Sequence, residues 1–420
     1  MTAERNWAGN YAYAAPVHRP ESIEQLQDLV RTSDKVRALG TRHSFNGIAD
    51  THGALISLAR FDRVTSLDRD NSTVTIEGGV RYGQLGQYLQ REGYALHNMA
   101  SLPHISVAGA CATATHGSGE KNGSLATAVR AMEVVDANGE RIALSRETHG
   151  DGFDGMVVSL GALGVVTSLT LDVVSGFDVR QDVYENLTFA SVEESFDAIQ
   201  SSGYSVSLFT DWTQNRFTQL WLKRRVEAGV AMETPASLFG ATRATTNLHP
   251  LADISADSCT AQMGIPGAWC DRLPHFRMEF TPSSGEELQS EYFVAREHGV
   301  AALGAMMSLG NEISPLLLVT EVRTIAADAL WMSPCYKQDS VALHFTWKQD
   351  WPAVRALLPR IESALEPFGA RPHWGKLFAM PATRIESLFE RLPAFRNLLE
   401  TFDPRGKFRN AFIDEYVFAQ

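Results

Sequence analysis

Two short segments in the last quarter of the chain alternate polar and apolar residues in a way that could build a binding floor. Glu321 and Arg323 are two positions apart, as are His344 and Thr346, and an apolar residue separates the members of each pair. In a β-strand, positions i and i+2 point to one face, so each pair would present two polar side chains together. Neighbouring strands of this kind suit a neutral ligand with several hydroxyls, since every buried hydroxyl needs partners. The alternative is that each pair simply lies on the solvent-exposed face of a sheet.

Two basic features accompany these pairs. Lys376 ends the segment HWGK at 373–376 and would supply a cation near such a floor, with an ordinary surface lysine as the alternative. The run Lys223-Arg224-Arg225 is short, and we expect it on a solvated face rather than in a nucleic-acid site.

A glycine-containing loop is expected where residues 39–46, LGTRHSFN, follow a strand. Gly40, Thr41, Arg42, His43 and Ser44 would expose consecutive backbone N–H groups, which bind phosphate without much positive charge. Taken alone, the segment could also be an ordinary loop in which Ser44 caps a short helix and His43 is solvated.

A second segment, residues 101–119, consists largely of small residues that would let a planar cofactor lie close to the backbone. Tight helix packing is the alternative for residues 108–114. His104 and His116 are predicted to be hydrogen-bonded scaffold residues, because no third ligand stands at metal spacing. We expect no metal site.

Several common motifs are missing from the sequence. It contains no strand-associated GxGxxG unit, no GxxxxGK[ST] and no GxSxG, which argues against a Rossmann nicotinamide site, a P-loop and the usual serine-hydrolase layout. Its four cysteines form no CxxC pair and are too few for a disulfide scaffold in a chain of 420 residues.

The elements that must position these residues follow from hydrophobic periodicity. Strands are expected at 53–58, 63–68, 73–77, 130–136, 140–144, 165–174, 204–212, 217–222, 316–324 and 340–347, and helices from 20, from 82, and near 295–309, 351–365 and 383–399. A change of composition after residue 175 predicts a domain boundary. We expect a domain at 1–175, a second at 176–369, and a segment at 370–420 that returns to the first.

The charge balance excludes some partners. With 37 Lys and Arg against 49 Asp and Glu, the net charge is −12, which disfavours nucleic acid and anionic membrane surfaces. The apolar runs are too short for a membrane span, and no secretion signal is recognised at the N-terminus. The expected location is the cytoplasm.

Long strings in the sequence resemble the vanillyl-alcohol oxidase family of FAD enzymes, in its sugar-lactone and alditol oxidase branch. They are LGTRHSFN, NMASLPHISVAGA, THGSG, LGALGVVT, HFTW, RPHWGK and DPRGKFRNAF, and the resemblance covers nearly the whole chain. It implies a two-domain α+β flavoprotein, with an FAD-binding α+β domain and a substrate domain built on a large antiparallel sheet flanked by helices.

The resemblance also implies roles in cofactor binding. His43 would be joined covalently to FAD, and the backbone of residues 39–44 and 115–118 would hold the pyrophosphate. The implied FAD-binding residues are Gly40, Thr41, Arg42, His43, Ser44, Ser101, Ser106, Gly109, Thr115, His116, Gly117, Ser118, Val166 and Asn410.

On the substrate side, the resemblance implies that Arg323 and Lys376 contact the reacting hydroxyl. Glu321, Thr346 and Ser101 would fix the other hydroxyls. The base is either His344, whose ordinary pKa is near 6.5, or Lys376, if burial lowers its pKa.

The implied activity is oxidation of the terminal primary hydroxyl of an alditol such as xylitol or sorbitol to the aldose. Hydride passes to the flavin, and O₂ is reduced to hydrogen peroxide, with another electron acceptor as the alternative. An aldonolactone oxidase or dehydrogenase of the same family is the second hypothesis, and a flavin-free binding protein on this fold is the third. The resemblance favours a monomer.

Overall fold

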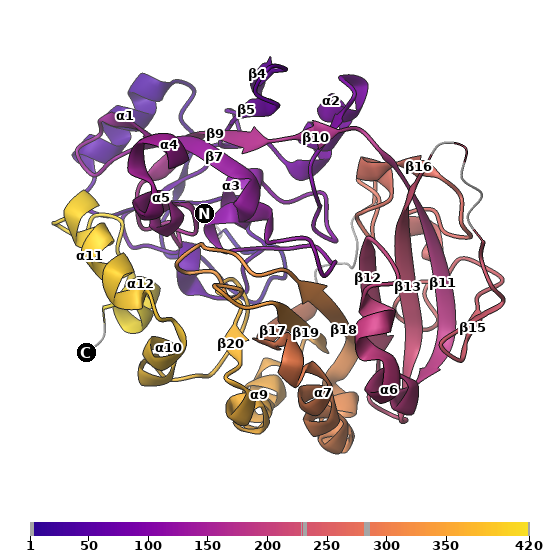
Figure 1. Ribbon diagram of the computed structural model, residues 1–420. Helices are drawn as coiled ribbons and strands as arrows, with labels where there is room; N and C mark the ends of the chain where they lie inside the picture. Colours follow the sequence, from indigo (N-terminus) through magenta and orange to yellow (C-terminus); the bar gives the residue numbers. More distant parts are fainter. Residues whose placement is uncertain (1–3, 228, 230–232, 281–285, 419–420) are drawn as a thin grey trace.

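The computed structural model describes residues 4–227, 229, 233–280 and 286–418. Figure 1 shows the first 175 residues on one side of the molecule and a large sheet on the other, with the C-terminal helices beside both. Helices and antiparallel sheets are segregated as in an α+β protein. The predicted fold class is confirmed.

The chain begins with a small parallel sheet of order β1-β3-β2. Its strands are Val17–His18, Val36–Ala38 and Ala54–Ile56. Helix α1, Ile23–Thr32, connects the first two; Ser22 caps it by accepting a hydrogen bond from the Gln25 N–H. The strand β2 leads directly into the loop that contains His43.

A five-stranded antiparallel sheet of order β4-β5-β9-β7-β8 follows. Burial alternates at every residue of β9, as expected for a strand with one face in the core. The tight turn between β7 and β8 has Gly139 at φ +79°, a conformation that favours glycine. The strands are Val64–Asp68, Thr73–Glu77, Val165–Asp172, Val129–Val135 and Arg141–Ser145, and the helices of this region are α2 Tyr82–Arg91, α3 Val107–Ala112, α4 Arg146–His149 and α5 Asp151–Val157.

A ten-stranded sheet dominates the rest of the molecule, in the order β14-β15-β11-β13-β12-β18-β19-β17-β20, with β16 paired to β11. Its strands are β11 Asp178–Thr188, β12 Ser205–Thr210, β13 Arg216–Val226, β14 Ser237–Leu238, β15 Ala241–Arg243, β16 Gly267–Ala268, β17 Glu287–Ala295, β18 Leu317–Ile325, β19 Ser340–Lys348 and β20 Arg371–Pro372. A separate pair joins β6 Tyr94–Ala95 to β10 Val174–Ser175.

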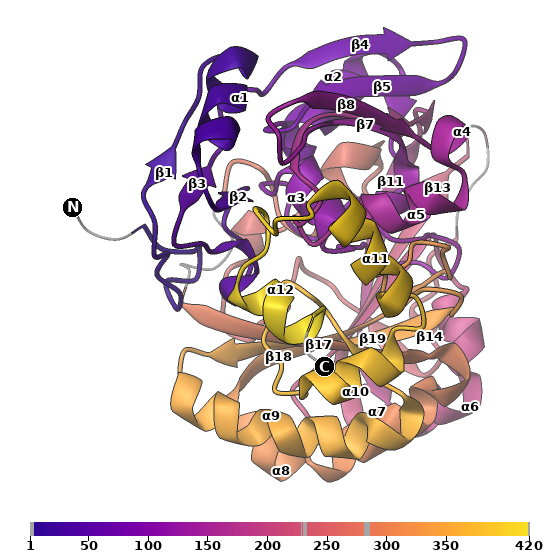
Figure 2. The ribbon, with the colours of Figure 1, turned by 90° about the vertical axis from the view of Figure 1, so that its left-hand side faces the viewer.

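The register of the central strands places three charged or titratable residues in one row. His344 on β19 is paired with Glu321 on β18 and with Glu291 on β17. Figure 2 shows α7, α8 and α9 in a layer below these strands, with the first 175 residues above. The helices flanking the sheet are α6 Phe189–Gln200, α7 Gly299–Ser308, α8 Gly310–Ile313 and α9 Trp351–Leu365.

The last segment contacts the small parallel sheet. The Val36 N–H donates to Lys407 O at 2.9 Å, and Lys407 Nζ donates to Val30 O at 2.6 Å. The single helix predicted at 383–399 is wrong: Phe389 is extended between two helices, and Pro393 lies in the first turn of the second, where a missing N–H costs nothing. The helices are α10 Ala382–Leu388, α11 Leu392–Phe402 and α12 Ala411–Tyr416.

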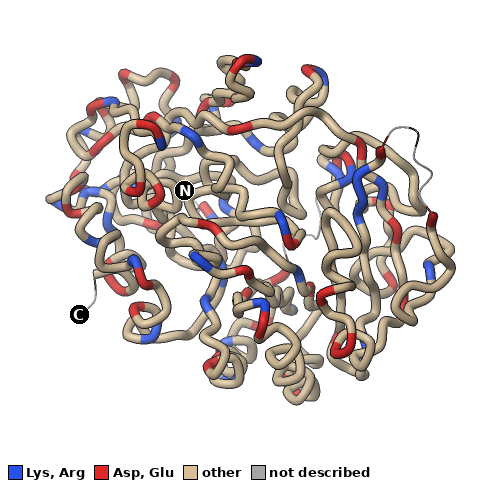
Figure 3. The backbone as a smooth tube through the Cα atoms, in the orientation of Figure 1, with Lys and Arg blue, Asp and Glu red and all other residues tan. Residues whose placement is uncertain are grey.

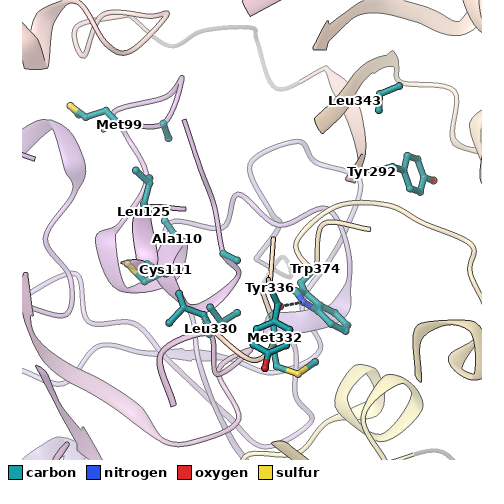
Figure 4. Packing of buried hydrophobic residues seen from close by; sticks show 14 of the residues in the cluster. Met99, Ala110, Cys111, Leu125, Tyr292, Leu330, Met332, Tyr336, Leu343 and Trp374 are labelled. Carbon is teal, nitrogen blue, oxygen red and sulfur yellow. Dashed lines mark hydrogen bonds between the residues drawn. The ribbon is translucent and has the colours of Figure 1, made fainter. Parts of the chain in front are cut away.

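One hydrophobic cluster runs through all three expected domain ranges. Figure 4 shows part of it, including Cys111 of α3 and Leu330, and the Trp374 indole donates to Met332 O at 2.7 Å. Residues 1–3 and 419–420 of those ranges lie outside the described residues, and the domain boundaries stay a prediction. In the part of the chain that the structure describes, no helix is long and apolar enough to span a membrane.

Candidate active site

Two adjoining cavities share part of their lining: strands of the ten-stranded sheet line the first together with segments of the first 175 residues, and residues of the first 175 alone line the second. Their volumes are about 820 and 640 Å³, each within the usual range for ligand pockets. Gly40, Thr41, His43, Ser106 and Gly109 line both. The two cavities are therefore parts of one extended site. The loop at 39–46 and the segment at 101–119 form the junction between them.

The loop with His43 is held from both sides. The Trp7 N–H donates to Arg42 O at 2.8 Å, and the Phe45 N–H donates to Gly375 O at 2.8 Å. Arg42 has φ +65°, a left-handed conformation uncommon for residues other than glycine. These contacts fix the backbone at the cavity junction.

His43 is half-buried in this loop. Its ring stacks on that of Trp7, with centroids 5.4 Å apart, and Nδ1 lies 3.1 Å from Thr41 Oγ1. Burial lowers the pKa of His43 to about 4. The imidazole is therefore neutral near pH 7 and has a nitrogen lone pair available.

Backbone atoms form much of the wall of the second cavity. A Cβ at Gly78 would lie 2.2 Å from Val166 O, and one at Gly79 would lie 2.0 Å from Leu58 O. At the junction, a Cβ at Gly40 would lie 2.9 Å from Ser106 Oγ. No larger residue fits these positions without movement of the backbone or of Ser106, so glycine lets these segments pack closely where they line the cavity. Gly78 and Gly79 were not among the residues predicted for the site from the sequence.

The polar floor of the first cavity comes from the strands predicted to carry it. Glu321, Arg323, His344 and Thr346 all line this cavity. The apolar residues that alternate with them belong to the hydrophobic cluster on the other face; they are Val322, Phe345 and Trp347. Lys376 lines the same cavity with its side chain 13% exposed, so the structure does not place it on the outer surface.

Glu291 on β17 is the central residue of the floor, although it was not among the residues predicted from the sequence. Its carboxylate accepts from Lys376 Nζ at 2.6 Å and from Arg323 Nη2 at 2.8 Å, and His116 Nε2 lies 3.4 Å away. Burial alone would raise the pKa of Glu291, but Lys376, His116 and Arg323 hold it well below its ordinary value. The residue is an ionised carboxylate that compensates two cations.

Glu321 is the second buried carboxylate. It accepts from His275 Nε2 at 2.7 Å, and Arg323 Nε lies 3.6 Å away. Burial favours its neutral form, but Arg323 and His275 hold the pKa of Glu321 well below its ordinary value. With both glutamates ionised and Arg323 and Lys376 protonated, the four charges of the floor cancel.

His344 joins the two halves of the floor. Nδ1 lies 2.5 Å from Lys376 Nζ, and Nε2 lies 3.1 Å from Thr346 Oγ1. Burial and the nearby Lys376 cation lower the pKa of His344 to about 4. An ammonium group has no lone pair, so Nδ1 accepts from Lys376 and the imidazole hydrogen lies on Nε2.

The residues predicted to bind FAD are divided between the two cavities. Ser44, Ser101, Thr115 and His116 line the first cavity, and Arg42 and Val166 line the second. The side chain of His116 lies beside Glu291, in the floor.

Three predicted residues lie apart from the cavities. Among the described residues, the lining of neither cavity includes Gly117, Ser118 or Asn410. Ser118 Oγ bonds to Ser207 Oγ at 3.0 Å. Asn410 caps α12, and its amide donates to the carbonyls of Gly47, Ile48 and Asp50. Its side chain is thus occupied in joining the C-terminal segment to the loop after residue 46.

Comparisons with known proteins define the class. The FAD binding domain family matches residues 14–145, and the D-arabinono-1,4-lactone oxidase family matches residues 285–416. Cholesterol oxidase from B. sterolicum has the same fold, with a TM-score of 0.78 at 14% identity over 99% of this chain and 96% of that chain. The chain belongs to the vanillyl-alcohol oxidase family and is an FAD-dependent oxidoreductase.

Two curated relatives extend over nearly the full length. Alditol oxidase of Streptomyces sp. (strain IKD472 / FERM P-14339) is 47% identical over 99% of this chain and 99% of its own. L-gulono-1,4-lactone dehydrogenase of Mycobacterium tuberculosis is 28% identical over 97% of each chain.

The site fits FAD. Gly40, Gly78, Gly79 and Gly109 put backbone rather than side chains at the wall of the second cavity, which joins the first cavity at His43. A long, flat dinucleotide requires this shape. The residues that would hold it are those of the loop at 39–46 and the segment at 101–119, together with Gly78, Gly79 and Val166. In the described part of the chain, no group of His, Cys, Asp or Glu could hold a metal ion.

Proposed function

We propose that the protein oxidises the terminal CH₂OH of an alditol such as xylitol or sorbitol to the aldehyde of the aldose, with FAD linked covalently to His43 and O₂ as the acceptor. The observation that carries this proposal is the buried, charge-balanced floor of donors and acceptors. It suits a neutral polyol, whose hydroxyls each need a partner. The 47% identical relative is an alditol oxidase.

Bound FAD supplies the two-electron acceptor and passes the electrons to oxygen. The protein's own groups orient the alcohol and handle its proton. Arg323 and Lys376 would stabilise negative charge that develops on the reacting oxygen, as donors in an oxyanion site do. Glu321, Thr346 and Ser101 would hold the remaining hydroxyls.

We assign the proton of the reacting hydroxyl to His344 Nδ1. Its low pKa keeps the imidazole neutral near pH 7. Burial lowers the pKa of Lys376 as well, but Glu291 acts in the opposite direction and accepts a hydrogen bond from its ammonium group, so we assign Lys376 as the cation. Lys376 Nζ lies 2.5 Å from Nδ1 in the structure, so the reacting hydroxyl would displace the ammonium group from Nδ1, accept a hydrogen bond from it and give its proton to Nδ1. Lys376 is then the electrostatic partner rather than the base.

The neutral state of His43 supports the covalent link, since a protonated imidazole could not form a bond to carbon through nitrogen. Acid precipitation tests it: yellow colour should remain with the polypeptide, and colour lost to the supernatant would contradict the link. Colourless purified protein would support a flavin-free binding protein instead.

An aldonolactone oxidase or dehydrogenase is the second candidate, because the D-arabinono-1,4-lactone oxidase family matches residues 285–416, which include the floor strands. Anaerobic reduction of the flavin by xylitol, sorbitol and a galactono- or gulono-lactone separates the two, since a dehydrogenase would release no peroxide. We expect reduction by the alditols; reduction by the lactone alone would favour the second candidate.

We further propose that residues 1–175 and 370–420 hold the cofactor and that 176–369 carry most of the substrate floor. A monomeric state and a cytoplasmic location belong to the same proposal. Size-exclusion chromatography with light scattering tests the monomer.

A further inference from the structure

Lys223 is fully buried on the same face of the sheet as the floor, although the basic run that contains it was predicted to be solvated. It lies on β13 with 1% of its surface exposed, whereas its neighbour Arg224 points to the other face and pairs with Asp182 at 3.0 Å. Figure 3 shows that Lys and Arg residues gather on β11 and β13, the strands that carry Arg180 and the run at 223–225. The alternation of β13 thus sends one member of the run inward, toward the site.

The Lys223 ammonium group uses all three of its donors. Nζ lies 2.6 Å from Leu273 O, 3.0 Å from Pro274 O and 3.0 Å from His275 Nδ1. His275 in turn contacts Glu321 through Nε2 at 2.7 Å. A chain of contacts therefore leads from Lys223 through His275 to a carboxylate in the cavity.

The ammonium group determines which nitrogen of His275 carries the hydrogen. Because Lys223 donates to Nδ1, the neutral imidazole carries its hydrogen on Nε2 and donates it to Glu321. Burial lowers the pKa of His275 to about 4, so this imidazole is neutral near pH 7. Without Lys223, the hydrogen could move to Nδ1, and an Nε2 lone pair would then face the Glu321 carboxylate.

Lys223 also fixes the segment that supports Ser101. The N–H groups of His275 and Phe276 donate to Ser101 O at 3.1 and 3.3 Å. Trp221 and Phe209 enclose the His275 ring, with centroids 5.0 and 5.8 Å away. Two expected substrate contacts, Glu321 and Ser101, thus depend on residues 273–276.

We propose that Lys223 is a positioning residue for the substrate: through His275 it orients Glu321, and through residues 273–276 it places Ser101. The proposal rests on the proposed function, in which these two residues bind hydroxyls remote from the base. Lys223 touches neither the base nor Lys376 in this arrangement. Its loss should weaken polyol binding more than it slows the chemical step.

The test uses the flavin-loaded Lys223→Met protein at pH 6. This pH lies below the pKa of about 7 to which burial lowers Lys223 in the wild type. Methionine is similar in size and leaves no buried charge, which favours folding. Stopped-flow reduction of the flavin by xylitol gives the Kd and the limiting rate. We expect the Kd to rise about 10-fold and the limiting rate to change less than about 3-fold.

The matched control is Gln181→Leu. Gln181 is the cross-strand partner of Lys223 on β11 and is fully buried, and neither polar atom of its amide has a hydrogen-bond partner among the described residues. This change should leave the Kd unaltered. In a Glu321→Gln background, Lys223→Met should raise the Kd by less than about 3-fold, because the route through Glu321 is already altered and only the route through Ser101 remains. Equal effects of Lys223→Met in both backgrounds, or a fall in rate without a rise in Kd, would overturn the proposal.

A measurement that needs no substrate separates this proposal from the proposed function. In ¹⁵N spectra of the wild-type holoenzyme, the His275 imidazole should be neutral with its hydrogen on Nε2. Hydrogen on Nδ1 would overturn the positioning role even if xylitol reduces the flavin. Failure of every alditol to reduce the flavin, with the Nε2 hydrogen observed, would contradict the proposed function alone.

Discussion

Lys376 Nζ lies 2.6 Å from Glu291 Oε2, although the two residues are 85 positions apart in the chain. The contact joins the segment after β20 to the middle of β17, and the same carboxylate also binds Arg323. Two buried cations can share the cavity because Glu291 lies between them and Glu321 balances the remaining charge.

Replacing Glu291 with glutamine should destabilise the protein strongly. The change keeps the shape but leaves Lys376 and Arg323 with one buried carboxylate between them, and removing one partner of a buried ion pair costs about 3–5 kcal/mol. Urea unfolding of the holoenzyme measures the loss. Glu312→Gln is the control, because Glu312 forms an exposed pair with Arg360 at 2.8 Å and such pairs contribute little. Equal midpoints for the two variants would contradict the central role of Glu291.

Lys376→Met should slow flavin reduction without preventing FAD binding. The loss of a cation that stabilises charge developing on the reacting oxygen typically lowers the rate by about 100- to 1,000-fold. Stopped-flow reduction with saturating xylitol measures the limiting rate. An unchanged limiting rate would remove Lys376 from the reaction.

If His344 is the base, its pKa sets the pH at which the limiting rate of flavin reduction falls on the acid side. Burial and Lys376 lower its pKa from 6.5 to about 4 in the folded protein, so the neutral base is present throughout the neutral range. The limiting rate of flavin reduction should stay level from about pH 8 to 6 and fall as the pH approaches about 4. A midpoint near 6.5 would show that the base is an unperturbed group. In His344→Ala, this fall toward about pH 4 should be absent, and the limiting rate at neutral pH should be lower than in the wild type.

The lowered pKa of His344 also makes the stability of the folded protein depend on pH. A histidine whose pKa is lower in the folded state stabilises the protein above its unfolded pKa of 6.5, and this contribution is lost as the pH falls from 6.5 toward 4. His275 has a similarly low pKa and acts in the same direction. Thermal unfolding of the wild type should therefore move to lower temperature across this window, and His344→Ala should reduce the slope.

His43→Ala should release FAD from the polypeptide after acid precipitation while leaving the glycine-lined second cavity able to bind it non-covalently. His104→Ala is the control, since His104 lines the second cavity and bonds to Met278 O at 2.9 Å. Covalent flavin retained in His43→Ala, or lost in His104→Ala, would assign the link to another residue.

The sequence predicted the parts of the site that follow a strand's alternation or a long recognisable string. Glu321 and Arg323 point into the cavity because Val322 between them packs in the core, and the same rule orients His344 and Thr346. The loop at 39–44 is also where the sequence placed it.

Glu291 could not be found in this way. The strand β17 is buried along nearly its whole length, so its polar residues do not mark a solvent face. His275 lies outside regular secondary structure, and only the contacts with Lys223 and Glu321 define its place. The wrong continuous helix at 383–399 arose because apolar periodicity continues across the break before Pro393. Knowledge of which strands pair, here β17 with β19, would have revealed Glu291 beside His344.

The central claim is that this floor binds a neutral polyol and delivers it for oxidation at the flavin. Anaerobic mixing of the holoenzyme with xylitol, followed by admission of air, tests it most directly. The account predicts that the flavin absorbance bleaches, that xylose forms in equal amount to the flavin, and that air restores the colour with release of hydrogen peroxide. A flavin that stays oxidised with xylitol and sorbitol would contradict the account.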